Sequence, residues 1–365
     1  MAGLWSNLKH ISAMARMFVQ ICSTKYLRTK VRVVPFAYLD VVDRCNSRCR
    51  TCDIWRPRPD SPPELTTDEI LSLRPALRRL KTQIVSIGGG EPTLRHDLET
   101  CIAAFRKDGM SVHINTNALA IDQARARSLA QAGLSVVYVS CDHPDRDGYK
   151  AIRGVDGLNR VVAAVEHFRS LPEPIPVGIN VVVSRLNQDA LEALADRCIK
   201  WGVQKLQFIP VHTYLRYREM VQAALEQLTP RREDLPDIKA TIGRIASRLQ
   251  ALGIETNSRF YIDHFETAYE FVRPVPCLAG SLFVMINPFG DVFPCYQQQK
   301  GLNIRQMPLD AIVRSTEFRA QRRGVVGCNL ACWDAGSAEP SIRFHLPYLL
   351  RHPIEVYREA RMHLG

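Results

Sequence analysis

The chain has 365 residues, of which 46% are hydrophobic and 23% charged. These ordinary values, with no low-complexity tract or internal repeat, exclude a disordered, fibrous or solenoid protein. No stretch approaches the ~20 apolar residues of a membrane-spanning helix. Because the weakly apolar first residues also carry Lys9 and Arg16, no secretion signal is indicated. We therefore expect a cytoplasmic protein with one large α/β domain and a smaller appended one.

The formal net charge is +11, which suits nucleic acid, an anionic membrane surface or an acidic partner. The basic residues are scattered along the chain, apart from residues 25–50 and the group Arg319, Arg322 and Arg323. Scattered basic residues are typical of solvated helix faces. The distribution therefore disfavours nucleic acid as a partner.

Both ends of the chain carry amphipathic patterns. In residues 4–24 apolar side chains recur at spacings of three and four, which predicts a helix. Residues 341–365 form an aromatic and basic tail. We expect the helix to pack on the body of the protein, and peripheral contact with a membrane surface is the alternative for both ends.

From residue 36 onward, short apolar runs alternate with segments of helical periodicity. Six strands, each followed by a helix, predict parallel βα units and a partial barrel whose functional loops lie at the carboxyl ends of the strands. The expected strands are 36–42, 83–88, 111–115, 135–140, 176–183 and 204–209. The expected helices are 67–80, 97–108, 121–132, 157–170, 188–201 and 237–252.

Three cysteines follow the first strand directly, since Cys45, Cys49 and Cys52 have the spacing Cys-x3-Cys-x2-Cys. In a chain without a secretion signal, clustered cysteines indicate metal ligands before disulfides. Three thiolates on one loop leave a coordination position of a metal centre open, which suggests chemistry rather than scaffolding. Taken alone, the three cysteines are also compatible with part of a zinc site.

A second cysteine group lies near the C-terminus and consists of Cys277, Cys295, Cys328 and Cys332. Residues 287–290 predict a hairpin turn that brings Cys295 back beside Cys277. Four thiols can then close on one centre, with a zinc knuckle as the alternative. Four isolated cysteines, which we expect to be packing residues, stand in apolar or helical settings: Cys22, Cys101, Cys141 and Cys198.

The loop at residues 45–52 resembles the cluster-binding signature of the radical S-adenosylmethionine (SAM) enzymes. The second strand ends in Gly-Gly-Gly-Glu-Pro at residues 88–92, which is similar to the Gly-Gly-Glu-Pro turn of that family. The resemblance implies that Cys45, Cys49 and Cys52 hold a catalytic [4Fe-4S] cluster whose free iron is chelated by SAM. It further implies reductive cleavage of SAM to a 5′-deoxyadenosyl radical, which abstracts hydrogen from a substrate.

The same resemblance assigns residues at successive strand ends to SAM. Glu91 would pair with the ammonium group of SAM, and Asn180 on the fifth strand is a weaker assignment. The residues implied to contact SAM are Gly89, Gly90, Glu91, Pro92, Asn115, Thr116, Asn117, Ser140, Asp142 and Arg153. The sequence departs from the family at Thr51, where an aromatic residue often lies near adenine, so adenine packing would fall to Ile54 or Trp55.

The second cysteine group resembles the twitch domain, a shortened relative of the SPASM domain, in which a hairpin and a helix carry an auxiliary [4Fe-4S] cluster. The resemblance implies that Cys277, Cys295, Cys328 and Cys332 hold such a second cluster. The implied fold is a partial (βα)6 TIM-like barrel with a small C-terminal twitch-type domain. The expected segments are an N-terminal helix at 1–30, the barrel at 31–235, a helical connection at 236–270, the auxiliary domain at 271–340 and a tail at 341–365.

The resemblance implies a radical SAM enzyme that carries out an oxidation, an epimerisation or a related biosynthetic step. Because the residues ahead of the barrel are too few for a leader-binding domain, a small metabolite is favoured as substrate. A peptide-modifying maturase is the alternative within the family, and a non-catalytic zinc or electron-transfer protein is the alternative from another class. A reducing partner such as flavodoxin or ferredoxin is expected.

Several histidines and tyrosines are candidates to face a substrate. His113 precedes the loop of the third strand and His212 follows the sixth strand, while Tyr214, Tyr261 and His264 are looser candidates. Structural roles are the favoured interpretation for all five. We therefore assign none of them a role in proton transfer.

Overall fold

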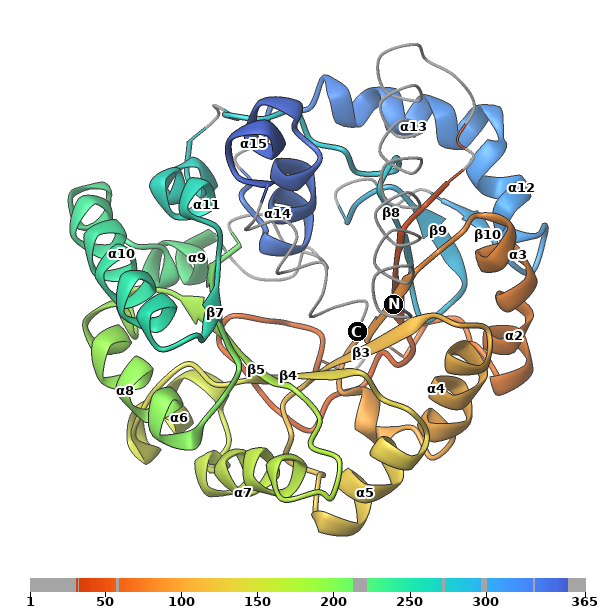
Figure 1. Cartoon of the computed structure of the whole chain (residues 1–365). Coiled ribbons are helices and arrows are strands. Elements are labelled where there is room, and N and C mark those ends of the chain that lie inside the picture. The colour runs from red at the N-terminus through yellow and green to blue at the C-terminus, as the bar shows by residue number, and fades with distance from the viewer. Residues whose placement is uncertain are drawn as a thin grey trace, which may run out of the picture.

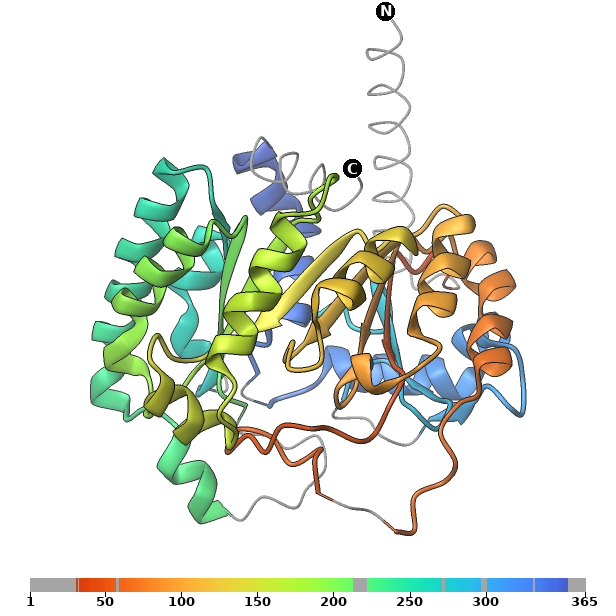
Figure 2. The same cartoon turned by 90° about the horizontal axis from the view of Figure 1, so that it is seen from below.

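The computed structural model describes residues 31, 33–56, 59–212, 222–270, 273–296, 301–330 and 332–353. Within these residues ten strands form one sheet in the order β10-β9-β8-β1-β2-β3-β4-β5-β6-β7. Helices cover the outer side of the curved sheet, as Figures 1 and 2 show. The predicted partial barrel is confirmed.

The barrel contains all six predicted strands, and neighbours in the chain pair in parallel. They are β1 (Phe36–Asp40), β2 (Ile84–Gly88), β3 (Ser111–Thr116), β4 (Val136–Ser140), β5 (Val177–Val183) and β6 (Lys205–Pro210). A further strand, β7 (Glu255–Thr256), pairs with β6. The sequence did not predict β7, because two residues are too few to show a strand period.

The helices that follow these strands include the predicted ones, but one predicted helix is divided and three short helices were not predicted individually. They are α2 (Thr67–Ser72), α3 (Arg74–Arg79), α4 (Leu98–Lys107), α5 (Gln123–Gln131), α6 (Arg146–Arg153), α7 (Leu158–Arg169), α8 (Leu191–Trp201), α9 (Gln222–Leu228), α10 (Leu235–Ala251) and α11 (Arg259–Asp263). The single helix predicted over 67–80 is wrong, since it is divided at Leu73. A proline in the first turn of α3 supplies no N–H for a continuous helix.

Helix α6 is the first of the three helices that the sequence did not predict individually. Asp145 caps its first turn by accepting a hydrogen bond from the backbone N–H of Gly148. Gly154 ends it in a left-handed conformation with φ 67°. Asp145 and Gly154 therefore define the two ends of the helix. Its C-terminal end reaches the cysteine loop.

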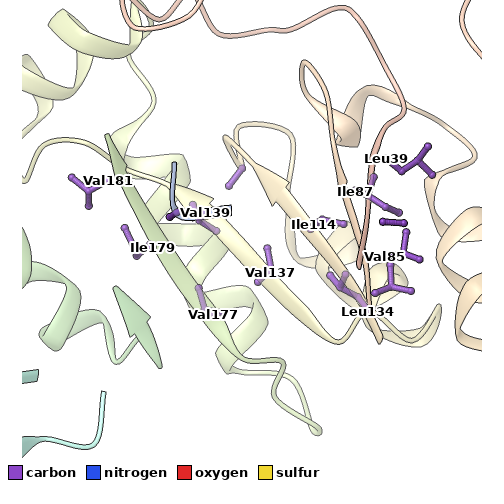
Figure 3. Packing of buried hydrophobic residues seen from close by; sticks show 14 of the residues in the cluster. Leu39, Val85, Ile87, Ile114, Leu134, Val137, Val139, Val177, Ile179 and Val181 are labelled. Carbon is purple, nitrogen blue, oxygen red and sulfur yellow. The ribbon is translucent and has the colours of Figure 1, made fainter. Parts of the chain in front are cut away.

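Side chains alternate across the barrel strands between two environments. Those directed at the helices are aliphatic and at most 1% exposed, as Figure 3 illustrates for Leu39, Val85, Ile87, Ile114, Val137, Val139, Val177, Ile179 and Val181. Alternate positions carry half-buried polar or aromatic side chains: Tyr38, Ser86, Asn115, Ser140, Asn180 and Gln207. The core thus lies between sheet and helices, and the inner wall of the barrel is left polar.

The C-terminal part extends the same sheet. Strand β8 (Phe283–Ile286) pairs in parallel with β1, and β9 (Asp291–Phe293) pairs antiparallel with β8. The predicted hairpin turn is confirmed, with Gly290 at φ 92°. Strand β10 (Leu302–Asn303) and helices α12 (Leu309–Arg314), α13 (Thr316–Val326), α14 (Ala335–Arg343) and α15 (Leu346–Arg351) follow. The domain boundary expected at residue 271 stays a prediction, and the sheet runs across it.

Helix α14 lies between the β7 side and the β8 side of the barrel (Figure 1). The Tyr38 hydroxyl on β1 donates to the Gly336 carbonyl at 2.7 Å. On the other side the rings of Tyr261 and Trp333 stack with centroids 5.5 Å apart, and Glu339 accepts a hydrogen bond from the Ser258 N–H. These contacts tie α14 to both sides of the opening.

In the part of the chain that the structure describes, no helix is both long enough and apolar enough to cross a membrane. The predicted N-terminal helix at 4–24 and the tail beyond residue 353 lie outside the described residues.

Candidate functional site

The loop with Cys45, Cys49 and Cys52 crosses the barrel rim from β1 toward α6 (Figure 2). Its first part pairs with the glycine turn after β2. The Gly90 N–H donates to the Val42 carbonyl at 2.8 Å, and the Glu91 N–H donates to the Arg44 carbonyl at 3.0 Å. Only glycine fits at position 90, because a Cβ there would lie 2.1 Å from the Arg44 oxygen.

The second part of the loop is held by the end of α6. The Arg48 N–H donates to the Arg153 carbonyl at 3.1 Å, and the Arg50 N–H donates to the Ile152 carbonyl at 2.9 Å. A Cβ at Gly154 would lie 2.3 Å from the Arg48 oxygen. Backbone hydrogen bonds therefore clamp the cysteine loop at both ends. Its position does not depend on the conformations of flexible side chains.

A buried ion pair approaches Cys49. Arg153 Nη1 lies 3.5 Å from Cys49 Sγ, while Arg153 Nε lies 2.7 Å from Asp142 Oδ2. The Arg153 and Asp142 side chains are 9% and 0% exposed, and Asp142 also accepts from the Val182 N–H at 2.8 Å. Burial raises the pKa of Asp142, and the attraction of Arg153 opposes that shift. The structure thus joins two residues that the sequence assigned separately to SAM.

The other two thiols of the loop resist ionisation. Burial raises the pKa of Cys45 to about 11 and that of Cys52 to about 12. Trp55 fixes the loop by donating from Nε1 to the carbonyls of Cys52, at 2.9 Å, and Cys49, at 3.2 Å. Because metal ligation requires thiolates, binding of a metal centre here would release protons.

Glu91 connects the glycine turn with the end of β3. One carboxylate oxygen accepts from the hydroxyls of Thr93 and Thr116 at 2.5 and 2.6 Å, and the other accepts from the Asn117 N–H at 2.7 Å. Burial raises the pKa of Glu91, and these hydrogen bonds oppose the shift. Its pairing with the ammonium group of SAM stays a prediction. In the structure, the carboxylate holds two loops of the rim together.

A chain of amides crosses the polar inner wall. Asn180 donates to Asn115 at 3.2 Å, and Asn115 donates to Ser86 at 3.0 Å. Asn180 Oδ1 is buried and has no hydrogen-bond partner among the described residues. Nearby, fully buried Ala118 adopts φ 61°, a conformation that costs a non-glycine residue ~1–2 kcal/mol. Unsatisfied polar atoms and backbone strain are typical of ligand sites.

The rim residues fit a [4Fe-4S] cluster and SAM. Three thiols lie on one clamped loop, the adjoining glycine turn brings backbone close to them, and Asn180 Oδ1 offers an acceptor to a polar ligand. A four-iron cluster binds each thiolate at a different iron, so the thiols need not converge on one point. Among the described residues no three His, Cys, Asp or Glu side chains are arranged around a single ion. The assignment of individual ligands stays a prediction.

The second cysteine group also contains an arginine. Arg273 Nη2 donates to Cys328 Sγ at 3.1 Å, and its charge also acts on Cys277 and Cys332. Burial raises the pKa of Cys277, and the Arg273 charge opposes the shift. Three of the four predicted ligands therefore act electrostatically on one guanidinium.

Cys295 is brought back by the hairpin. A Cβ at Gly280 would lie 2.7 Å from Pro294 Cβ, so the segment after Cys277 packs against the residue before Cys295. Both thiols are half-buried. The predicted approach of the two segments is confirmed, and ligation by these cysteines stays a prediction.

The remaining cysteines agree with the sequence analysis. Cys101, Cys141 and Cys198 are each 0% exposed and belong to the main hydrophobic core, which confirms their packing role. Cys22 and Tyr214 lie outside the described residues.

The candidate histidines and Tyr261 have structural contacts. His113 is 4% exposed, with Nε2 3.1 Å from the Ser111 hydroxyl. The Tyr261 hydroxyl donates to the Trp333 carbonyl, and His264 contacts the Phe260 carbonyl. His212 Nε2 lies 3.3 Å from Asp334 Oδ2 at the N-terminus of α14.

One supporting pair was missed by the sequence analysis. Arg95 forms an ion pair with Asp97 and also donates from Nη1 to the carbonyls of Val41 and Leu65 at 3.0 and 2.9 Å. Burial alone would raise the pKa of Asp97, but hydrogen bonds from Arg95 and Thr67 lower it to about 2. The pair anchors the end of β1 just before the cysteine loop. Two opposite charges two residues apart were the only signal in the sequence.

These features define an α/β barrel with a cysteine loop at the rim, and known proteins resemble this chain in sequence and in fold. The model of the radical SAM superfamily matches residues 39–198. The PqqA peptide cyclase of Xanthomonas campestris pv. campestris strain 8004 is 27% identical over 307 residues, covering 80% of this chain and 77% of the relative. The PqqA peptide cyclase of Rhodopseudomonas palustris is 26% identical over 270 residues, covering 72% and 67%.

Two solved structures share the fold. Streptococcus suis SuiB bound to the precursor peptide SuiA has a TM-score of 0.64 and 18% identity, covering 83% of this chain and 70% of that one. The protein anSMEcpe with bound AdoMet has a TM-score of 0.62 and 16% identity, covering 89% and 100%. Residues 39–198 of the chain thus match the radical SAM superfamily, whose members are enzymes that use a [4Fe-4S] cluster and SAM.

Proposed function

We propose that this radical SAM enzyme modifies a peptide. The observation that carries the proposal is the likeness to PqqA peptide cyclases, which extends over 80% of the chain and beyond the superfamily core. The likeness in fold to SuiB, solved with its precursor peptide, is compatible with it. The preference for a small metabolite rested on the few residues before the barrel, and the relatives favour the peptide alternative instead.

In this proposal Cys45, Cys49 and Cys52 hold the catalytic cluster, and the rim residues from Gly89 to Arg153 described above hold SAM. When bound, cluster and SAM supply a radical able to take a hydrogen atom from the substrate. The chain itself positions the reactants, because backbone hydrogen bonds clamp the loop at both ends. Helix α14 closes the open side of the barrel and limits access of water to its inner wall.

The polar inner wall would orient the substrate beside SAM. The Asn180–Asn115–Ser86 chain fixes amide groups along three strands, with one unsatisfied acceptor in the wall. Peptide N–H groups are donors that such an acceptor can bind. Cys277, Cys295, Cys328 and Cys332 would hold the auxiliary cluster, and a flavodoxin or ferredoxin would supply electrons to the enzyme in the cytoplasm.

The substrate class is tested with the anaerobically reconstituted enzyme, SAM and dithionite. Synthetic peptides encoded by short reading frames beside this gene are incubated with it, and a panel of small metabolites is the comparison. We expect one peptide to lose two hydrogen atoms by mass spectrometry while 5′-deoxyadenosine forms in equal amount. Turnover of a metabolite, with every peptide unchanged, would contradict the proposal.

The two cysteine groups are tested by metal analysis. We expect ~8 iron atoms per chain, falling to ~4 when Cys45, Cys49 and Cys52 are all replaced by Ala. The matched control replaces the three buried packing cysteines Cys101, Cys141 and Cys198 by Ala and should retain ~8 iron atoms. Zinc without iron in the wild-type protein would rule out both clusters.

A further inference from the structure

Helix α13, which leads into Cys328, carries three arginines on one face. Arg319, Arg322, Arg323 and Val326 have the spacing i, i+3, i+4, i+7, so their side chains form one stripe along the helix. Arg319 and Arg322 are half-buried, and Arg323 is exposed. We call this stripe, together with Leu330, the α13 basic surface.

The α13 basic surface lies over the second cysteine group. Phe318 and Val325, which are 1% and 3% exposed, anchor the helix on its buried side. A Cβ at Gly280 would lie 3.3 Å from Arg322 Cγ and 2.7 Å from Pro294 Cβ. The stem of Arg322 therefore packs on the loops that carry Cys277 and Cys295.

The three arginines repel one another without compensation. Among the described residues none of the three forms an ion pair with a carboxylate. Burial lowers the pKa of Arg322, and the charges of Arg319 and Arg323 lower it further. Like charges three or four residues apart destabilise a helix, so an external anionic group would relieve this repulsion.

Two exposed apolar side chains complete the surface beside Cys328. Val326 is 78% exposed and Leu330 is 39% exposed. An apolar centre with charged residues around it is typical of protein interfaces. A surface that binds nucleic acid needs positive charge but no apolar centre, and a surface that binds a membrane has a larger apolar face. The combination favours a protein with acidic groups.

We infer that the α13 basic surface docks a small acidic electron carrier of the flavodoxin or ferredoxin type. The inference rests on the proposed function, because the cysteine group below the surface would then hold a redox cluster. Complementary charge steers such a carrier to the surface and orients it there. The apolar contact at Val326 and Leu330 would hold it in short-lived complexes.

The inference is tested by binding of an oxidised acidic flavodoxin to the reconstituted full-length enzyme, followed by flavin fluorescence. The double variant R319E/R323E should weaken binding by ~10-fold or more at low ionic strength and remove most of its salt dependence. The matched control R127E/R160E changes the charge equally at exposed positions of α5 and α7, far from α13 in Figure 1. It should change affinity by less than ~2-fold.

Two further variants keep the test independent of folding. R323Q changes one exposed residue and should weaken binding by ~2- to 5-fold, and V326D should weaken it by ~5-fold through lost apolar contact. Equal effects of the α13 and control double variants would overturn the inference. Undiminished binding of R319E/R323E, or tighter binding of a DNA duplex to the same surface, would also overturn it.

Iron content and dithionite-driven SAM cleavage are measured on the same samples. If variants with ~8 iron atoms cleave SAM and bind flavodoxin as well as wild type, the docking inference fails and the proposed function stands. If the wild-type protein lacks the second cluster but loses flavodoxin binding in R319E/R323E, the docking inference stands and the auxiliary-cluster part of the proposed function fails.

Discussion

In each of the two cysteine groups an arginine contacts a cysteine sulfur, but the positive charge of the arginine is balanced differently in the two groups. Arg153 lies 3.5 Å from Cys49 and is paired with buried Asp142. Arg273 lies 3.1 Å from Cys328, and the charged groups that act on it are cysteines. A deeply buried guanidinium requires a counter-charge, whereas the half-exposed one is screened by water.

The backbone differs in the same direction. The first group lies on one loop of eight residues, clamped between a glycine turn and the end of α6. The second group is spread over a hairpin and the segments after α11 and α13. The arginine of the first group is therefore neutralised and its loop is fixed in position, while the second group is open to an external anionic partner.

The largest expected difference concerns SAM cleavage. Replacing Cys45, Cys49 and Cys52 by Ala should lower 5′-deoxyadenosine formation by at least ~1,000-fold, because in the proposed function these three cysteines hold the catalytic cluster. Replacing Cys277, Cys328 and Cys332 by Ala should leave uncoupled SAM cleavage within ~10-fold of wild type. Both are measured by chromatography with dithionite as reductant. An equal loss of SAM cleavage in both variants, with the first cluster retained in the variant of the second group, would contradict the distinction between the two cysteine groups.

The arginines should differ in stability. Arg153→Met leaves Asp142 buried without its partner and should lower the free energy of unfolding by ~3–5 kcal/mol. Arg273→Met should cost at most ~1 kcal/mol. Urea unfolding of the apo-proteins measures both, and the double variant Asp142→Asn/Arg153→Met should recover part of the loss. A smaller loss of unfolding free energy for Arg153→Met than for Arg273→Met would contradict the stronger pairing of Arg153.

Glycine substitutions test the backbone clamp. Gly90→Ala places a Cβ 2.1 Å from the Arg44 carbonyl oxygen and should cost ~2–3 kcal/mol. Gly280→Ala meets a side-chain carbon at 2.7 Å and keeps φ 74°, for which we expect ~1–2 kcal/mol. Gly327→Ala, with nothing within 4 Å, is the control. Thermal unfolding in which Gly280→Ala destabilises the protein more than Gly90→Ala would argue against the clamp.

The smallest effect concerns the link between the two regions. Arg305, after β10, pairs with Glu69 of α2 and lowers the pKa of Glu69 to about 2. A carboxyl with a depressed folded pKa stabilises the protein above its unfolded pKa, and this contribution is lost as the pH falls toward 2. Arg305→Gln should cost ~0.5–1 kcal/mol at pH 7 and nothing near pH 2. A pH-independent difference in urea unfolding would contradict this assignment.

The sequence predicted the barrel strands well, because each is a short run rich in buried aliphatic residues between segments of helical periodicity. Helix α6 escaped prediction because it has only eight residues, and its buried Tyr149, Ile152 and Arg153 span little more than one helical turn, which is too short to establish a period. The split at Leu73 depends on a local proline effect within an otherwise continuous pattern.

The candidate site was predictable where residues are close in sequence. Spacing alone indicated Cys45, Cys49 and Cys52, and the turn residues indicated the hairpin before Cys295. The contacts of Arg95 with Val41 and of Arg153 with Cys49 were not predictable, because they join segments 54 and 104 residues apart. Such pairs depend on the tertiary arrangement of strands, which no local pattern encodes.

The parallel pairing of β1 with β8 has a consequence for biosynthesis of the chain. One edge of β1 pairs with β2 soon after both leave the ribosome, but the other edge pairs with residues 283–286. For most of translation the first strand therefore presents an unpaired edge, with apolar Ala37 and Leu39 beside it. Fragments that stop before residue 280 should aggregate even though they contain all the residues that the proposal assigns to SAM.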